Sequence, residues 1–359
     1  MSGKGRLRVV LMWHMHQPQY RNASTGQYEQ PWTYLHAIKD YVDMAAHLEA
    51  CPEARAVVNF APVLLEQIDD YAAQVKASLE SGASISDPLL AALACPALPA
   101  DREARLRLVR ACTRANEQRL VDRFPAFRRL VDLAGFCLEH PEGVDYLSEQ
   151  YFADLLVWYH LAWMGETVRR SDSRIRQLQD KEGRYTLHDR QQLLGIIGEL
   201  LAGVIGRYRR LAEAGQAELS MTPYAHPIVP LLLDLQSARE AMPEVHLPHH
   251  PAYPGGLERA EWHVREGLAT FERHFGFRPA GCWPSEGGVS EATLALLEAQ
   301  GFRWAASGES VLAHSVSCEG KPWEGECREN ALFRPASLKQ GELACFFRDD
   351  GLSDLIGFS

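Results

Sequence analysis

Residues 8–13 read Arg-Val-Val-Leu-Met-Trp, a short and nearly continuous apolar run. Runs of this kind are typical of strands that are buried on both faces of a parallel sheet. Residues 14–18 read His-Met-His-Gln-Pro, so polar side chains follow the predicted strand directly and a proline closes it. Barrels and open α/β sheets place their chemistry after the carboxyl ends of such strands. This stretch therefore predicts an α/β fold with a site after its first strand.

Further apolar segments predict the remaining strands of the sheet, at residues 56–60, 217–221, 302–306 and 343–347. Amphipathic helices are expected at 255–275 and 290–300. Because strands and helices alternate, the sheet is expected to be parallel with right-handed crossovers. Between these parts, apolar residues recur at helical spacing through 63–79, 102–120 and 191–211. We interpret 63–214 as a mostly helical insertion, and 1–62 with 215–359 as the core.

The stretch 154–163 inside this insertion is aromatic-rich and apolar nearly all round. A helix packed between insertion and core accounts for that pattern, and so does a surface that stacks on sugars. The buried helix is the interpretation we favour.

Composition limits the class of partner. The 359 residues are 46% hydrophobic and 23% charged, which excludes a disordered chain. The 37 Lys and Arg against 47 Asp and Glu give a net charge of −10, which disfavours nucleic acid as the main partner. No stretch reaches 18 apolar residues and the N-terminus lacks a signal-peptide pattern, so we expect no membrane partner and a cytoplasmic location.

The cysteines are scattered and form no Cys-x-x-Cys pair, so the sequence does not predict a zinc ribbon. We expect free thiols rather than disulfides. The eight cysteines are Cys51, Cys95, Cys112, Cys137, Cys282, Cys318, Cys327 and Cys345.

Three polar clusters follow predicted strands and are expected to meet at one end of the sheet. They supply hydrogen-bond donors, an aromatic face and a carboxylate, which are the groups that a pyranose site needs. The clusters are His14, His16 and Gln17; Tyr224 and His226; and Trp283 and Glu286.

Glu286 is the strongest single candidate for a catalytic residue. It lies between Pro284 and Gly287, before a predicted helix whose amino end would favour the ionised carboxylate, as suits a nucleophile. A helix N-cap is the alternative role for this glutamate, and the residues alone leave both open.

His14 and His16 also have a metal interpretation, because residues i and i+2 of a strand point to the same face. The third ligand of a zinc site would have to come from elsewhere. His249 and His250 precede a proline in a predicted loop and are expected to face solvent. Residues 348–350, Arg-Asp-Asp, either line the same site or cap the next helix.

Taken together, the motifs at 13–18, 218–228, 281–287 and 347–358 resemble glycoside hydrolase family 57, in its amylopullulanase-like and α-amylase-like branch. The resemblance implies an incomplete (β/α)7 barrel, retaining chemistry on α-glucosidic bonds of α-glucans, and neither metal nor cofactor. It implies Glu286 as the nucleophile and His16, His226 and Trp283 as contacts of the first donor subsite. The full set of expected substrate contacts is His14, His16, Gln17, Tyr224, His226, Trp283, Arg348 and Asp349.

The same branch carries its general acid in a motif that resembles Asp-Gly-Glu-Asn-x-Trp-Glu, and no such string occurs here. We therefore expect an N-terminal catalytic portion, truncated at the C-terminus. Asp349, Asp350 and Asp354 are the aspartates of the last strand region. Asp354 is expected to open a helix, and Asp349 to be paired with Arg348.

Two alternatives stay open beside a retaining α-glucan hydrolase or glucanotransferase. One is a zinc-dependent enzyme of the mannosidase or deacetylase kind that uses His14 and His16. The other is a non-catalytic fragment that binds glucan. The sequence does not decide between hydrolysis and transfer, between α-1,4 and α-1,6 bonds, or among oligomeric states.

Overall fold

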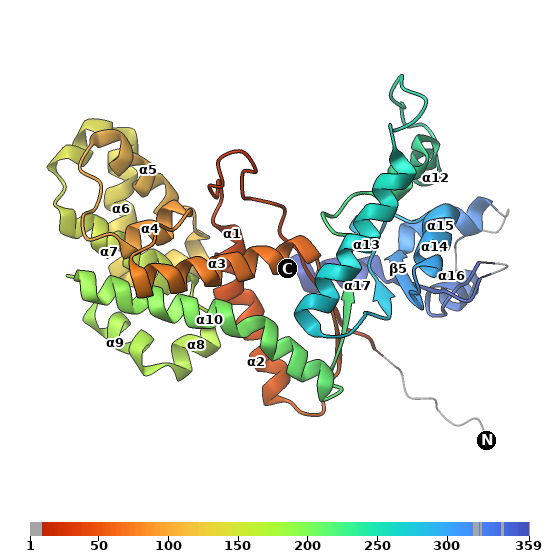
Figure 1. Cartoon of the computed structure of the whole chain (residues 1–359), viewed down its shortest axis with the longest axis horizontal. Helices are drawn as coiled ribbons and strands as arrows, with labels where there is room; N and C mark the ends of the chain where they lie inside the picture. Colours follow the sequence, from red (N-terminus) through yellow and green to blue (C-terminus); the bar gives the residue numbers. More distant parts are fainter. Residues whose placement is uncertain (1–8, 319–322, 324, 339–340, 359) are drawn as a thin grey trace. The chain divides into compact units, whose positions relative to one another are not determined.

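The computed structural model describes residues 9–358, apart from 319–322, 324 and 339–340. Figure 1 shows the chain coloured along its sequence. It divides into two compact units. The core unit comprises Met1–Pro18, Arg55–Leu65 and Ala212–Ser359, and the helical unit comprises Gln19–Ala54 and Glu66–Leu211. The sequence-based division had placed residues 19–54 with the core.

The core unit is built on a six-stranded sheet in which every neighbouring pair is parallel and the strand order follows the sequence. This arrangement confirms the predicted α/β class with parallel strands and agrees with an incomplete barrel. The strands are β1 (Met12–Met15), β2 (Ala56–Phe60), β3 (Ala217–Met221), β4 (Gly281–Cys282), β5 (Trp304–Gly308) and β6 (Ala344–Arg348).

The first strand starts later than its apolar run suggested. Val9 and Val10 are exposed and precede β1, which pairs with β2 from Met12 onward. Hydrophobicity alone therefore overestimated how far this strand extends toward the N-terminus.

The sheet is curled, as side chains from distant strands show. In a flat sheet, β1 and β4 would lie about 14 Å apart, because neighbouring strands are about 4.8 Å apart. Yet the ring centroids of His14, on β1, and Trp283, directly after β4, are 6.4 Å apart. The guanidinium of Arg348, at the end of β6, lies 5.9 Å from the same indole ring. The carboxyl ends of these strands therefore converge on one region.

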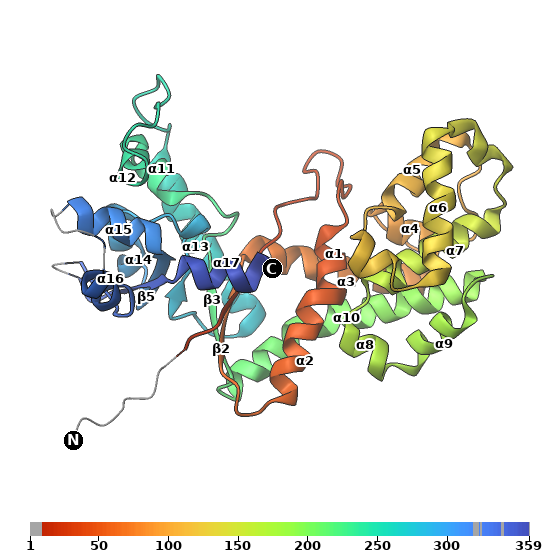
Figure 2. The same ribbon diagram turned by 180° about the vertical axis from the view of Figure 1, so that it is seen from behind.

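Helix α13 (Gly256–Phe275) packs closely against the core because two of its positions lack a side chain. A Cβ at Gly267 would lie 2.5 Å from the Met221 side chain of β3, and one at Gly256 would lie 1.8 Å from the Leu232 carbonyl oxygen. Figure 2 shows α13 beside the strands from behind. The other helices of this unit are α11 (Val229–Leu233), η4 (Leu235–Ser237), α12 (Ala238–Ala241), η5 (Ser285–Gly287), α14 (Glu291–Ala299), α15 (Glu309–Cys318), α16 (Gly325–Leu332) and α17 (Asp350–Phe358).

The helical unit contains no strand. Its two long helices, α3 and α10, approach closely where a Cβ at Gly198 would lie 2.6 Å from the Val75 side chain. Its elements are α1 (Trp32–His36), the π-helix η1 (Ala37–Tyr41), α2 (Val42–Ala50), α3 (Pro62–Ser81), α4 (Pro88–Ala94), α5 (Arg102–Cys112), the π-helix η2 (Glu117–Val121), α6 (Pro125–Glu139), η3 (Pro141–Tyr146), α7 (Glu149–Trp163), α8 (Glu166–Ser171), α9 (Ser173–Lys181) and α10 (Leu187–Glu213).

The aromatic-rich stretch 154–163 lies in α7 and is buried over nearly its whole length. The Trp158 indole donates a hydrogen bond to the Glu182 carbonyl oxygen at 2.9 Å, which satisfies its only polar atom. The side chains are therefore core of the helical unit and do not form an exposed surface for sugars.

Two further expectations concern thiols and membranes. Cys51, Cys95, Cys112, Cys137, Cys282 and Cys345 are not in disulfides, in agreement with the expected thiols. The side chains of Cys318 and Cys327 lie outside the described part of the structure. Within the described part of the chain, none of the helices combines the length and the hydropathy that a membrane span requires.

Candidate active site

A polar row crosses three neighbouring strands near their carboxyl ends. His14, Asn59 and Ser220 occupy matching register positions on β1, β2 and β3. The His14 Nδ1–H donates to Asn59 Oδ1 at 2.7 Å, and Asn59 Nδ2 donates to Ser220 Oγ at 3.1 Å. Because Nδ1 of His14 is engaged in this bond, its Nε2 is left for other partners. The buried Asn59 thus fixes the orientation of the first histidine.

His14, His16 and His226 form a compact group, which we call the histidine cluster. The centroids of His16 and His226 are 4.0 Å apart with an interplanar angle of 17°, and those of His14 and His226 are 5.3 Å apart. His16 directly follows β1, and His226 lies in the loop after β3. Two of the predicted polar clusters therefore meet, as the sequence predicted.

Loss of hydration lowers the pKa of each histidine in the cluster. It lowers the pKa of His226 to about 3 and that of His16 to about 4, with further lowering from the neighbouring imidazoles. Desolvation also lowers the pKa of His14, although the Asn59 hydrogen bond and the Glu286 carboxylate act in the opposite direction. The three rings are therefore neutral at pH 7, and each offers one nitrogen lone pair.

Glu286 lies next to this cluster. Its Oε1 is 3.7 Å from Nδ1 of His226, and its side chain is 73% exposed whereas that of His226 is 7% exposed. Since His226 is neutral at pH 7, the contact is not an ion pair at that pH. The carboxylate is thus held beside the imidazoles with its oxygens open to a ligand.

The turn that carries Glu286 has an unusual backbone. Glu286 adopts φ 55° and ψ 19°, and Gly287 follows with φ 68°. The buried Ser285 lies 3.3 Å from Thr222 between hydroxyl oxygens, and Ser307 donates to the Gly287 carbonyl oxygen at 2.5 Å. These contacts, one to the residue directly after β3 and one to β5, hold the turn in place. The N-cap of α14 is Ser290, so the alternative role of Glu286 as a helix cap is wrong.

Trp283 and Arg348 form one wall of the site. Trp283 is only 7% exposed, so its ring is a buried wall and not an exposed platform. A Cβ at Gly287 would lie 3.5 Å from Cζ2 of this indole, so the ring packs against the turn that carries Glu286. Arg348 lies over the indole and also pairs with Asp350, with 2.8 Å between Nε and Oδ1.

Asp349 has a different partner from the one expected. Its Oδ2 lies 3.3 Å from a guanidinium nitrogen of Arg328 on α16, whereas Arg348 pairs with Asp350. Its Oδ1 accepts a hydrogen bond from the Leu352 N–H at 2.9 Å, so Asp349 caps α17. This backbone bond, together with Arg328, lowers the pKa of Asp349. The capping role considered for residues 348–350 is thus confirmed at Asp349, whereas Arg348 packs over Trp283.

Tyr224 lies in the same loop as His226 and contacts an aromatic residue that the sequence analysis missed. Its ring meets that of Trp262, on α13, edge to face at 5.4 Å between centroids, and Trp262 is 43% exposed. The Tyr224 N–H donates to the His263 carbonyl oxygen at 2.9 Å, which ties the loop to α13. Gln17 is half-buried directly after His16.

Two signals in the sequence could have identified the missed residues. Asn59 is a polar residue within the otherwise apolar run of β2, and a buried polar side chain needs a partner. Trp262 occupies an otherwise polar stretch of an amphipathic helix. No comparable signal marked Arg328, because its contact with Asp349 depends on where α16 packs.

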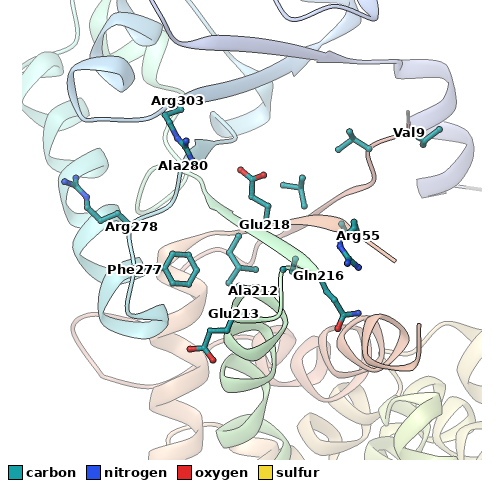
Figure 3. A pocket seen from close by; sticks show the side chains of 16 residues that line it. Val9, Arg55, Ala212, Glu213, Gln216, Glu218, Phe277, Arg278, Ala280 and Arg303 are labelled. Atoms are coloured by element: carbon teal, nitrogen blue, oxygen red, sulfur yellow. The ribbon is translucent and has the colours of Figure 1, made fainter. Parts of the chain in front are cut away.

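A pocket at the other end of the sheet is lined in part by the first residues of β2 and β3, Ala56 and Ala217. Figure 3 shows that this pocket carries side chains of both signs. Glu218 accepts a hydrogen bond from the Trp304 indole at 2.6 Å there. Ligands of parallel α/β sheets bind at the carboxyl ends of the strands, so this pocket is separate from the candidate site. The charged residues of its lining are Arg55, Glu213, Glu218, Arg278 and Arg303.

The family model of glycosyl hydrolase family 57 matches residues 10–359. The chain belongs to glycosyl hydrolase family 57. The resemblance inferred from its motifs is thereby confirmed over nearly the whole length. No curated protein matches the chain.

Several solved structures are similar to this chain. The α-amylase AmyC of Thermotoga maritima is 13% identical, with 97% of this chain and 46% of that one covered and a TM-score of 0.47. A family 57-type branching enzyme of Pyrococcus horikoshii is 16% identical, with 97% and 48% covered and a TM-score of 0.44. A 4-α-glucanotransferase of Thermococcus litoralis is 13% identical, with 97% and 28% covered and a TM-score of 0.42. The chain thus spans less than half the length of each of these proteins.

Proposed function

We propose that this family 57 chain carries the donor-sugar half of an α-glucan-acting retaining site, with Glu286 as the nucleophile. The observation that carries the proposal is the position of Glu286. Its carboxylate is exposed, lies 3.7 Å from His226, and is held on a turn that β3 and β5 brace. A retaining mechanism needs one ionised carboxylate that attacks the anomeric carbon and forms a glucosyl-enzyme.

The histidine cluster supports this role by its charge state. Neutral imidazoles donate or accept hydrogen bonds to sugar hydroxyls without forming an ion pair with Glu286. An unpaired carboxylate keeps its negative charge available to the anomeric carbon as positive charge develops there. His14, His16 and His226 are therefore proposed as contacts of the sugar on which Glu286 acts.

Tyr224 and Trp262 extend the proposed binding surface beyond this sugar. Half-exposed aromatic rings are suited to packing against the C–H faces of pyranoses. Because Tyr224 is two residues from His226, a glucan chain bound at Glu286 could continue along these rings. An oligosaccharide or polysaccharide of α-linked glucose is thus proposed as the substrate, through either hydrolysis or transfer.

The test compares Glu286→Gln with Glu291→Gln, an exposed glutamate of α14 five residues along the chain. Turnover of α-glucosyl fluoride and binding of maltoheptaose are measured for both variants and for the unmodified chain. Glu286→Gln keeps the shape of the side chain, so binding is expected to persist while turnover falls by several orders of magnitude. Glu291→Gln is expected to leave both unchanged.

Two outcomes would contradict the proposal. If Glu286→Gln retains more than about a tenth of the turnover, another group is the nucleophile. If the unmodified chain binds maltoheptaose but never releases fluoride from α-glucosyl fluoride, the chain is a glucan-binding module. This is the non-catalytic alternative that the sequence left open.

A further inference from the structure

The histidine cluster has the composition and spacing of a metal-binding site. His14, His16 and His226 each offer one ligand nitrogen, and these three atoms lie within 4.8 Å of one another. Two imidazole nitrogens on one tetrahedral zinc ion are about 3.3 Å apart, given Zn–N distances near 2.05 Å. The ligand atoms therefore need to close by no more than about 1.5 Å, which ring rotation can supply. Imidazole nitrogen is a preferred ligand of zinc, copper and nickel.

The hydrogen bonds around the cluster favour ligation by free nitrogens. His14 Nδ1 is occupied by Asn59, so Nε2 is the free nitrogen of that ring. Metal-bound histidines usually hold their other ring nitrogen in such a bond, which fixes the ring orientation. A neutral imidazole with a free lone pair is the form that binds a metal.

His226 supplies an independent observation. Its side chain is 7% exposed, and its Nε2 is a buried polar atom with no hydrogen-bond partner among the described residues. With its proton on Nδ1, toward the Glu286 carboxylate, the Nε2 lone pair is unsatisfied. A buried polar atom without a partner is costly, and coordination to a cation would satisfy it. The Glu286 carboxylate lies 3.7 Å from Nδ1 of His226 and adds negative charge beside the cluster.

We propose that His14, His16 and His226 bind one divalent transition-metal ion of the zinc type, and that this ion and a glucan exclude each other. The second half rests on the proposed function, because it uses the same histidines as sugar contacts. The ion is thus an inhibitor of the glucan site and not a catalytic cofactor.

The metal half is tested on the whole chain after treatment with a chelator. Zn²⁺ is titrated by calorimetry, and Co²⁺ is titrated by visible absorption, which reports a tetrahedral site with nitrogen ligands. One saturable ion per chain is expected. His16→Gln is expected to abolish this binding, and Asn59→Ala to weaken it by roughly 10–100-fold, the usual effect of removing a group that orients a ligand.

The matched control is the double variant His249→Gln/His250→Gln, since these two histidines are exposed and lie outside the cluster. It is expected to bind one ion like the unmodified chain. Thermal unfolding without metal shows whether each variant is folded. If His16→Gln does not fold, the Co²⁺ spectrum of Asn59→Ala tests the site instead. The metal site is refuted if no saturable binding occurs, or if the control variant loses it while His16→Gln retains it.

The exclusion half is tested by titrating maltoheptaose with and without saturating Zn²⁺. An apparent Kd that rises in proportion to free Zn²⁺ supports it, and an unchanged Kd refutes it. If the chain binds one Zn²⁺ through the cluster but never binds maltoheptaose, the metal site stands and the proposed function fails. The two proposals are thereby separable.

Discussion

His226 and Glu286 share a backbone conformation as well as a contact. Both have left-handed φ angles, 58° and 55°, and their side chains lie 3.7 Å apart between Nδ1 and Oε1. Residues other than glycine rarely adopt this region of φ, and holding one there costs about 1–3 kcal/mol of folding stability. Two such residues therefore meet at the centre of the proposed site. The surrounding contacts hold both residues in this strained conformation.

Replacing Glu286 by glycine is expected to leave the chain at least as stable as before. The relieved strain of about 1–3 kcal/mol exceeds the entropy that glycine loses on folding, about 0.5–1 kcal/mol. Little packing is lost, because the Glu286 side chain is 73% exposed. The free energy of unfolding in urea measures the outcome. Turnover of α-glucosyl fluoride is expected to disappear at the same time.

Glu291→Gly is the matched control for this experiment. Glu291 is exposed in the first turn of α14, where glycine has no strain to relieve and costs up to about 1 kcal/mol. A loss of stability in Glu286→Gly that equals or exceeds the loss in Glu291→Gly would show that the turn is not strained.

Trp283→Ala is expected to reduce stability and activity together. The indole is 7% exposed and packs against Gly287, so its removal opens a cavity beneath the Glu286 turn. Losses of about 3–5 kcal/mol are usual for a buried tryptophan replaced by alanine. Trp283→Phe keeps an aromatic ring there and is expected to lose less of both quantities. Urea unfolding and α-glucosyl fluoride turnover provide the two measurements. Full stability in Trp283→Ala would mean that the ring contributes only to ligand binding.

Stability of the helical unit is expected to depend on pH through His160. This residue is fully buried on α7, donates from Nδ1 to the Leu156 carbonyl oxygen at 2.8 Å, and accepts from the Tyr34 hydroxyl at 3.0 Å. Desolvation lowers the pKa of His160 from 6.5 to about 4. Between these values the unfolded chain binds a proton that the folded chain does not. His160 therefore stabilises the fold fully above pH 6.5, and that contribution falls as the pH drops toward 4.

His160→Gln isolates this contribution, because glutamine does not titrate. The free energy of unfolding is measured for the unmodified chain and for the variant. The advantage of the unmodified chain is expected to shrink by up to about 3 kcal/mol between pH 7 and pH 4. Asp87, whose pKa burial raises to about 6, contributes in the opposite direction, but equally in both proteins. A difference that stays constant over this range would contradict the assigned protonation of His160.

Hydrophobic runs and alternation were enough to place most of the sheet. The strands at 56–60 and 217–221 match the structure residue by residue, because most residues of both strands are buried. The same reasoning could not place the start of β1, since Val9 and Val10 are apolar but exposed. It also could not pair Asp349 with Arg328, because that contact joins residues from separate elements. Local pattern thus predicts elements, whereas side-chain partners depend on packing.

The same contrast holds within the site. The histidines and Glu286 were predicted because polar residues at several strand ends must converge in a parallel sheet. Asn59 was missed as a functional residue because its role exists only through its register with His14 and Ser220. Register across β1, β2 and β3 is a property of the folded sheet and cannot be obtained from any one strand.

Asp349 and Asp350 are both poorly suited to protonate the leaving group. Asp349 is a poor general acid, because the Leu352 N–H and Arg328 lower its pKa, and Asp350 is engaged by Arg348 and by the Ser310 N–H. General acid catalysis typically contributes about 10²–10⁴-fold, and departure of a sugar alkoxide depends on it. Fluoride departs with little protonation. The chain is therefore expected to turn over α-glucosyl fluoride far faster than maltoheptaose. Asp349→Asn is expected to leave the maltoheptaose rate within about threefold, since this carboxylate is not the acid. Comparable rates on the two substrates, with the maltoheptaose rate lost in Asp349→Asn, would instead identify Asp349 as the proton donor.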